Sequence, residues 1–411
     1  MKSHYTKVII ITILLEFYIS NFLFLNLSNK NCVNNKNNIS QNLVFRDLYS
    51  ELSSMQNYID IVFNYTLIDK GKKFYLHNNP KISIVMSIYN GEAFIKRALL
   101  SIQNQDFKDI EIVMVDDCSK DNSLNLIKEL MVYEPRITLY QNEENRGALF
   151  TKVKGILLAK GKYIMVLDED DIFVQRDAFT TLYKEAEKNN LDILRFGMLM
   201  SKIKINIIRS NSTKPEPPII YQPELGRKMF HFTQSGEIVQ EGGTLVNYFI
   251  KKGIYEKAIK QLDEKYLRVK INVHDDFFVF YLLIKSACSY KEIDKFFYLV
   301  IMDWDINEPA VKFRTSEKYK ERANQKCFGY FNFMEFILNK TENTYYDKKL
   351  AFFNYKLLLL NNQCRNNTKY IEKAINISYL YLENKYILEE DKNEIRKFIN
   401  EKKQKVVNES Y

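Results

Sequence analysis

The stretch Lys162–Phe173, which reads KYIMVLDEDDIF, joins an apolar run to a cluster of four carboxylates. Tyr163–Leu167 is short, apolar and partly β-branched, which is typical of a strand buried on both faces. Asp168–Asp171 follow directly, and four like charges at a strand end repel one another unless a positive charge lies among them. Oxygen ligands of this kind suit Mg²⁺ or Mn²⁺ shared with a substrate phosphate. A solvated acidic turn is the alternative interpretation, and the preceding sequence bears on the choice.

The segment before this stretch alternates apolar runs with single amphipathic helices. Strands are predicted at Ile82–Ile88, Ile110–Val115 and Ile137–Tyr140. The helices that follow the first two strands are marked by apolar residues at helical spacing, namely Phe94, Ala98 and Ile102, and then Leu124, Ile127 and Met131 on the inner side. This alternation predicts an α/β fold with a mostly parallel central sheet flanked by helices.

Polar clusters fall at the carboxyl ends of three of these strands. They are Tyr89-Asn90, Asp116-Asp117 and Asp168–Asp171. Ligands of open parallel sheets bind outside the carboxyl ends of the strands, so the three clusters predict one site. The sequence has no GxGxxG, and Gly155–Lys162 has neither the spacing nor the strand order of a P-loop. A phosphate at this site would therefore be held through a metal ion.

Composition argues against a nucleic-acid-binding protein and against a zinc site. The chain has 411 residues, is 46% hydrophobic and carries a formal charge of +9 that is spread along its length. No basic stripe or nucleic-acid module is present, so we expect no nucleic-acid partner. Its five cysteines are far apart and its histidines number four, which argues against a zinc site. An odd number of cysteines allows at most two intrachain disulfides, and their pairing cannot be read.

The N-terminal region resembles a membrane anchor. Val8–Leu27 is long enough as a helix, about 30 Å, to cross a bilayer core, and Lys2 and Lys7 precede it. We predict an uncleaved signal-anchor, with a cleaved signal peptide or a buried helix as alternatives. Residues 28–79 then form a polar stem. The positive N-terminal side predicts a single-pass type II membrane protein with its bulk in the lumen of the Golgi or ER, and sequons such as Asn38 are compatible with this.

With these residues assembled, Lys81–Asp305 resembles the family 2 nucleotide-sugar glycosyltransferases, which have the GT-A fold. Ile82–Gly91 is similar to the opening strand and tyrosine–asparagine turn of the family, and Val115–Ser119 to its second-strand motif. The resemblance implies that a nucleotide-sugar donor lies over Tyr89 and Asn90.

The resemblance also assigns the other donor residues and the metal. Asp117 is expected to hydrogen-bond the nucleotide base, and Lys152 falls where the family usually has an arginine on the donor. Asp168-Glu169-Asp170 is similar to the DxD metal motif of the family. Asp170 is then the expected direct ligand of Mn²⁺ or Mg²⁺, with Asp168 and Asp171 supporting it through ribose, water or metal.

Asn272–Phe278 is similar to the Glu-Asp motif that opens a helix and supplies the catalytic base. Asp276 takes the position of the base and Asp275 that of the preceding acid, while His274 stands where glycine is frequent. A base is needed because a sugar hydroxyl is a poor nucleophile. An ordinary acidic helix N-terminus is the alternative interpretation, because aspartate is favourable there without any catalysis.

These expectations give a domain organisation and a function. Residues 1–27 are the cytosolic tip and anchor, 28–79 the stem, 80–305 the catalytic domain with one apolar helix over Leu245–Ile259, and 306–411 a helical region that packs on the domain or recognises the acceptor. The expected activity is inverting, metal-dependent transfer of a hexosyl or N-acetylhexosaminyl group from a nucleotide sugar, UDP-linked by expectation, to a glycan, glycoprotein or glycolipid. The alternatives are a nucleotidyltransferase and a catalytically inactive, membrane-anchored carbohydrate-binding or adaptor protein.

Overall fold

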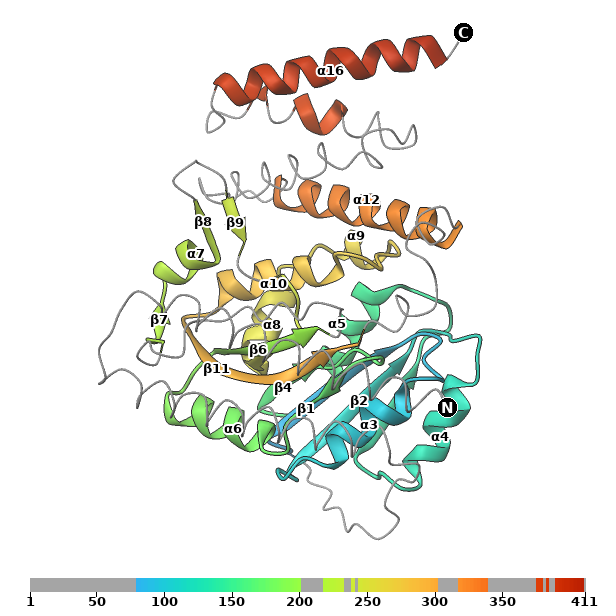
Figure 1. Cartoon of the computed structure of the whole chain (residues 1–411), viewed down its shortest axis with the longest axis vertical. Coiled ribbons are helices and arrows are strands. Elements are labelled where there is room, and N and C mark those ends of the chain that lie inside the picture. Colours follow the sequence, from blue (N-terminus) through green and yellow to red (C-terminus); the bar gives the residue numbers. More distant parts are fainter. Residues whose placement is uncertain are drawn as a thin grey trace, which may run out of the picture.

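The computed structural model describes residues 79–200, 217–232, 238–240, 243–301, 317–338, 375–379, 382–383 and 389–409. Its main element is a nine-stranded mixed sheet in the order β3-β2-β1-β4-β10-β6-β11-β5, in which β7 also pairs with β11. Helices lie on both faces of this sheet, and α12 and α16 lie beyond α10 on one side (Figure 1).

The first half of the sheet is parallel, which confirms the prediction from the alternating pattern. β1 (Ile82–Ile88) pairs in parallel with β2 (Ile110–Asp116) and with β4 (Tyr163–Val166), and β2 pairs in parallel with β3 (Ile137–Gln141). The four carboxyl ends therefore meet at one edge of the sheet, where the three polar clusters were expected.

Three helices connect these strands. They are α3 (Ile95–Gln103), α4 (Ser123–Met131) and α5 (Ala148–Leu158). α5 packs closely on the sheet because Gly155 has no side chain: a Cβ there would lie 2.5 Å from Val85 Cγ1. The start of α5 lies at the edge of the sheet that carries the polar clusters, where the N–H of Gly147 donates to Asp117.

The predicted inner face of α4 is partly wrong. Ile127 is buried as predicted, but Leu124 and Met131 are only half-buried, whereas Leu126 and Leu130 lie in the core. The buried residues form an i, i+1, i+4 stripe instead of the predicted i, i+3, i+7 stripe, so the helix is rotated from the expected orientation.

The second half of the sheet is mixed. β10 (Tyr248–Lys251) lies between β4 and β6 (Ile193–Met200) and is antiparallel to both. The prediction of a single helix over 245–259 is therefore wrong in its first part, because α8 begins only at Lys252 (Lys252–Ile259). Tyr248, Phe249 and Ile250 are aromatic and β-branched residues buried on both faces, and a continuous apolar run does not distinguish a buried strand from a buried helix.

The remaining strands complete the far side of the sheet. β11 (Ser289–Val300) is parallel to β6 and antiparallel to β5 (Ile172–Phe173) and β7 (Ile220–Tyr221). A separate hairpin pairs β8 (Phe230–Phe232) with β9 (Ile238–Gln240). The other helices of this part are α6 (Ala178–Lys188), α7 (Glu224–Met229), α9 (Glu264–Leu267) and α10 (Asp275–Ser286).

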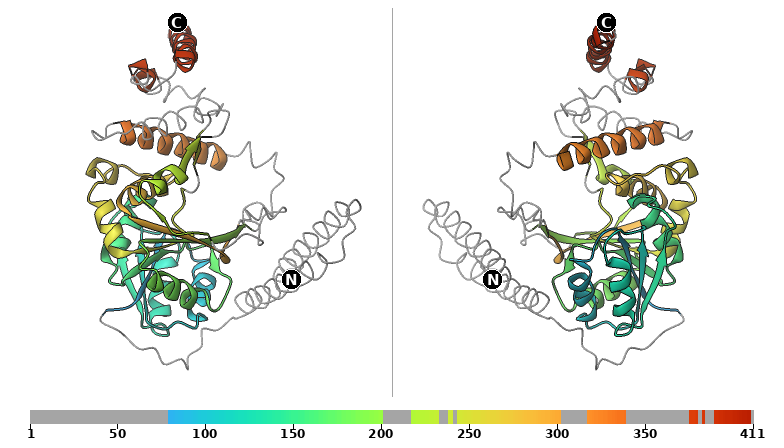
Figure 2. Two further views of the ribbon diagram at one scale, coloured as in Figure 1. Left: turned by 90° about the vertical axis from the view of Figure 1, so that its left-hand side faces the viewer. Right: turned by 90° about the vertical axis from the view of Figure 1, so that its right-hand side faces the viewer.

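The described parts of the C-terminal region are helical. α12 (Glu317–Leu338) packs against α10, and α16 (Glu389–Glu409) lies farther out (Figures 1 and 2). Cys327 of α12 is disulfide-bonded, whereas Cys118 and Cys288 are free.

The predicted anchor at 8–27 and residues 28–78 of the predicted stem lie outside the described residues. Within the part of the chain that the structure describes, no helix is both long enough and apolar enough to span a bilayer. The type II membrane topology stays a prediction.

Candidate active site

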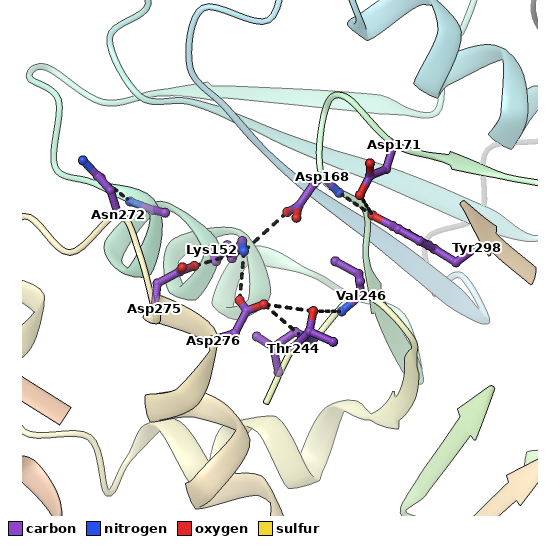
Figure 3. A network of polar contacts seen from close by, with 11 residues as sticks. Lys152, Asp168, Asp171, Thr244, Val246, Asn272, Asp275, Asp276 and Tyr298 are labelled. Atoms are coloured by element: carbon purple, nitrogen blue, oxygen red, sulfur yellow. Dashed lines mark hydrogen bonds and ion pairs between the residues drawn. The ribbon is translucent and has the colours of Figure 1, made fainter. Parts of the chain in front are cut away.

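Lys152 lies at the centre of the polar edge of the sheet, where it joins the two acidic clusters of the sequence (Figure 3). It is on the first turns of α5, and its side chain is almost fully buried. Its Nζ lies 3.4 Å from Asp168 Oδ1 at the end of β4, 3.0 Å from Asp275 Oδ2 and 2.8 Å from Asp276 Oδ1 at the start of α10. The DxD-like segment and the proposed base thus face one another across a single ammonium group.

This environment keeps Lys152 charged. Burial alone would lower its pKa, but the carboxylates of Asp168, Asp275 and Asp276 outweigh burial and hold the pKa well above its usual value. A buried charge persists when it is paired in this way. The lysine therefore neutralises part of a cluster that would otherwise be strongly acidic.

The acidic strand end is tied to β11 through Asp171. Its Oδ2 accepts a hydrogen bond from the hydroxyl of Tyr298 at 2.9 Å, and its Oδ1 accepts one from the backbone N–H of Ile301 at 2.8 Å. The Tyr298 oxygen in turn accepts a hydrogen bond from the backbone N–H of Asp168 at 3.2 Å. Both oxygens of Asp171 thus have partners in the protein, which gives it a framework role that its sequence position did not indicate.

Charge repulsion within this cluster shows in the pKa values of its members. Burial, followed by the negative charges of Asp168 and Asp170, raises the pKa of Glu169 to about 8. The same causes, in the same order, raise the pKa of Asp171 to about 8. The segment is held in place partly by Arg97, whose guanidinium donates to the backbone carbonyl of Asp170 at 2.6 Å. Cation binding at this turn would relieve the repulsion.

Asp276 lies at the N-terminus of α10, and both of its carboxylate oxygens have partners in the protein. Oδ1 is bonded to Lys152, and Oδ2 accepts hydrogen bonds from the backbone N–H of Leu245 at 3.0 Å and from the Thr244 hydroxyl at 3.2 Å. These contacts fix the direction of the carboxylate. Burial raises the pKa of the neighbouring Asp275 to about 7, against the opposing charge of Lys152.

His274 precedes this pair in the backbone conformation that glycine usually supplies. Its φ of 62° and ψ of 17° are left-handed, which is uncommon for a residue other than glycine. Burial, and then the charge of Lys326, lower its pKa to about 3, so the ring is neutral near pH 7. The backbone thus adopts the left-handed conformation that glycine favours, although the residue is histidine.

Of the residues expected around the nucleotide, one is exposed and another holds the surrounding loops together. Tyr89 is 42% exposed, and Lys270 Nζ lies 5.9 Å from the centre of its ring. Asn90 instead joins two loops, since its Oδ1 accepts from the backbone N–H of Lys120 at 2.8 Å and its own N–H donates to Ser119 Oγ at 3.0 Å. The Tyr89 side chain is therefore partly accessible to a ligand, while Asn90 shapes the turn that carries it.

Asp117 is buried and organises the loop that leads into α5. Its Oδ1 accepts from Asn142 Nδ2 and from the backbone N–H of Arg146, both at 2.8 Å, and its Oδ2 accepts from the backbone N–H of Gly147 at 2.8 Å. The hydrogen bond that Asp117 is expected to accept from a nucleotide base thus competes with the three that it accepts from the protein. Asn142 was not found from the sequence, because it lies in the polar run QNEENR at residues 141–146, in which nothing distinguishes it from its neighbours.

Comparison with known proteins addresses the identity of this site. Residues 83–262 match the sequence model of the family described as Glycosyl transferase family 2. The matched segment, residues 83–262, is a glycosyl transferase family 2 domain.

Curated relatives of the family 2 domain include the glycosyltransferase GlyG of Streptococcus pneumoniae, which is 35% identical over 113 residues, 28% of this chain and 37% of that protein. A GalNAc(5)-diNAcBac-PP-undecaprenol beta-1,3-glucosyltransferase of Campylobacter jejuni is 31% identical over 136 residues, 33% of this chain and 43% of that protein. The matched segments thus cover less than half the length of either relative.

The crystal structure of TarS residues 1–349 from S. aureus in complex with UDP superposes with a TM-score of 0.54 at 16% identity, covering 78% of this chain and 88% of that one. This likeness shows that the fold is the α/β GT-A arrangement, including the mixed sheet.

The residues Asp168–Asp171 resemble a metal motif, so we asked whether their arrangement could hold a metal ion. Within the described residues, no group of three or more His, Cys, Asp or Glu side chains is arranged to hold a metal ion by itself. A metal ion held by one or two of these carboxylates would be completed by oxygens of water or substrate. The raised pKa values of Glu169 and Asp171 and the excess of carboxylates over cations fit a cation that arrives with a phosphate-bearing substrate.

Proposed function

We propose that the chain is an inverting glycosyltransferase. It would move a sugar from a nucleotide-diphospho-sugar, most simply a UDP-sugar, to a hydroxyl of a glycan, glycoprotein or glycolipid. The observation that carries this proposal is the position of Lys152, whose ammonium contacts Asp168 on one side and Asp275 and Asp276 on the other. A donor and an acceptor must meet within a few ångströms for displacement at the anomeric carbon. Two acidic motifs that share one ammonium group satisfy that requirement.

The donor side is assigned to the residues of the first half of the sheet. Tyr89 offers a half-exposed ring for the base, and Asp117 holds the loop that supports the start of α5. Lys152 is a cation within reach of a diphosphate that approaches Asp168. As a point charge, it would bind phosphate without the bidentate geometry that an arginine provides.

Asp168 and Asp170 are the residues proposed to hold Mn²⁺ or Mg²⁺ together with the diphosphate. When bound, such a cation supplies charge stabilisation for the leaving diphosphate. Asp171 is proposed to act on this metal indirectly, because its oxygens are engaged by Tyr298 and Ile301.

Asp276 is proposed as the base that receives the proton of the acceptor hydroxyl. The bonds from Leu245 and Thr244 fix its Oδ2, and among the described residues Oδ1 is bound to Lys152 alone. If the diphosphate of the donor attracts Lys152, Oδ1 becomes free to take the proton while the hydroxyl oxygen bonds to the anomeric carbon and the diphosphate leaves. Asp275, which is more buried, is proposed to orient the pair.

Relatives support the choice of donor. The S. aureus protein TarS has been crystallised with UDP and with UDP-GlcNAc, and the Campylobacter jejuni relative is described as a glucosyltransferase. A UDP-linked hexose or N-acetylhexosamine is therefore the first donor to test.

Membrane attachment through residues 8–27, with the domain in the lumen, remains part of the proposal.

The test is a panel of UDP- and GDP-sugars incubated with the full chain, with and without Mn²⁺, and with water or simple sugars as acceptors. Metal-dependent release of UDP from one donor is the expected result. Release without any metal dependence would remove the metal from the proposal.

One observation favours a second function. Lys152 neutralises carboxylates of both motifs, and both oxygens of Asp276 have partners within the protein. The site is therefore satisfied without any substrate, which is compatible with an inactive carbohydrate-binding protein. Such a protein would bind an oligosaccharide without releasing nucleotide from any donor of the panel. Glycan binding with no turnover, in protein shown to be folded, would select this alternative.

A further inference from the structure

The turn before the proposed base is enclosed by the C-terminal helix α12. In both Figure 1 and Figure 2, α12 lies across α10 on the side away from the sheet. The contact is aromatic: Phe278 of α10 lies with its ring centre 5.3 Å from that of Phe333 and 5.4 Å from that of Phe336. Tyr266 of α9 extends the same contact, with its ring centre 5.3 Å from that of Phe336. We call these four residues the aromatic seam.

Outside the aromatic seam, Gly329 of α12 lies directly against the backbone of the turn before α10. A Cβ at Gly329 would lie 2.0 Å from the carbonyl oxygen of Val273, 3.1 Å from its carbonyl carbon and 3.4 Å from His274 Cβ. Two of these three atoms are backbone atoms, which cannot rotate away as the end of a flexible side chain could. Any residue larger than glycine at this position would therefore push the turn or the helix apart.

Tyr330, the next residue of α12, also contacts the turn. The ring of Tyr330 lies 3.8 Å, centre to centre, from the ring of His274, and the ring of Phe277 lies 4.8 Å from it. His274 is in the left-handed conformation and is followed at once by Asp275 and Asp276. A shift of the turn would change the direction in which α10 presents both carboxylates.

We propose that α12 is a positioning element of the active site and that Gly329 and Tyr330 set the geometry of the Val273–His274 turn and thereby of Asp276. This inference rests on the proposed function and gives the C-terminal region a role in it. Gly329 and Tyr330 touch neither donor nor acceptor in this account, so they act only through the turn.

The test compares two glycine substitutions in the full chain. Gly329→Ala is expected to lower kcat on the order of 10- to 100-fold, because small displacements of a catalytic group have effects of this size. The affinity for UDP with Mn²⁺, measured by calorimetry, should stay within about twofold, since the donor residues lie on other elements. Gly253→Ala is the matched control: Gly253 is also helical, and a Cβ there meets nothing within 4 Å, so both quantities should be unchanged.

Tyr330→Leu provides a second variant if Gly329→Ala does not fold. It removes the ring on His274 and should also lower kcat with little change in nucleotide affinity. An unchanged kcat in folded Gly329→Ala, or an equal loss of kcat and nucleotide affinity, would overturn the inference.

Hydrogen exchange separates this inference from the proposed function. In Gly329→Ala the backbone amides of residues 275–277 should exchange faster than in the wild type, while those of β4 should not change. This readout applies even if the wild-type chain transfers no sugar, in which case the proposed function fails and the positioning of the turn is still decided. Unchanged exchange at 275–277 would refute the positioning role.

Discussion

Replacing Lys152 by methionine tests the central feature of the site. Methionine fills a similar volume but removes the one ammonium group that contacts Asp168, Asp275 and Asp276. We expect the variant to fold at neutral pH with a large loss in the free energy of unfolding. We further expect that loss to increase with pH.

The distances set the size of the effect. At an effective dielectric constant of about 20, contacts of 2.8, 3.0 and 3.4 Å correspond to attractions of roughly 6, 5.5 and 5 kcal/mol. Most of this offsets the cost of burying the charges, and removing one partner of a buried pair typically destabilises a protein by about 3–5 kcal/mol. Because three carboxylates lose the same partner, we expect the upper end of that range.

The dependence on pH follows from Asp275. Its pKa in the folded protein is about 7, above its ordinary value of 3.8, so its contribution to stability is present at low pH and is lost as the pH rises through about 7. Lys152 lowers this pKa, so Lys152→Met should raise it further. Each additional unit would cost about 1.4 kcal/mol above the new pKa.

Urea denaturation of both proteins between about pH 5.5 and 9 measures the difference. Lys154→Met, on the same helix, is the control, because within the described part of the chain Lys154 Nζ contacts neutral oxygens, at 2.8 Å from Asn142 Oδ1 and 3.4 Å from the Gln141 carbonyl. Its effect should be small and independent of pH. A difference between Lys152→Met and wild type that is below about 1 kcal/mol, or the same at both ends of the pH range, would refute the electrostatic reasoning.

Three further predictions concern single carboxylates. Asp276→Asn should abolish transfer and leave donor affinity near normal, whereas transfer that survives in Asp276→Asn but not in Asp275→Asn would make Asp275 the base. Asp170→Asn should lower activity on the order of 100-fold and weaken Mn²⁺-dependent nucleotide binding, and calorimetry that finds this binding unchanged would remove Asp170 from the site. The free energy of unfolding of the wild type should fall as the pH rises toward 8, because the pKa of Asp171 is raised from 3.8 to about 8 in the folded protein. Asp171→Asn should flatten this dependence in a urea series, and an unaltered slope would count against that cause.

The fold of the first half of the domain could be predicted because each strand there is a short apolar run bounded by polar turns. β1, β2 and β4 follow the predicted ranges closely, and their parallel pairing follows from the single helices between them. β10 could not be predicted in the same way. Tyr248–Ile250 is buried on both faces between two strands that are distant in sequence, so its environment is created by tertiary structure that the local pattern does not encode.

The location of the site was predictable, but its internal contacts were not. Carboxyl ends of parallel strands converge by geometry, which is why Asp117 and Asp168 could be placed at one edge from sequence alone. The partners of a buried charge depend on side-chain directions across the fold. The contact of Lys152 with Asp276 spans 124 residues, and the bond from Tyr298 to Asp171 spans 127. Neither pair has a sequence pattern that would reveal it.

The charge balance of the site suggests an order of events. One ammonium group and the three carboxylates that contact it carry a formal charge of −2 when all are ionised, and between −1 and −2 near pH 7, where burial keeps Asp275 partly protonated. The edge would therefore repel a bare diphosphate. A diphosphate that arrives with a divalent cation is attracted by Asp168 and Asp170 and at the same time offers Lys152 a new anionic partner. Release of Lys152 from Asp276 would then expose the base only after the donor is bound. Under this arrangement the donor binds before the acceptor, and product-inhibition kinetics in which UDP competes with the donor but not with the acceptor would support it. UDP inhibition competitive with both substrates would instead indicate that the base is accessible without the donor.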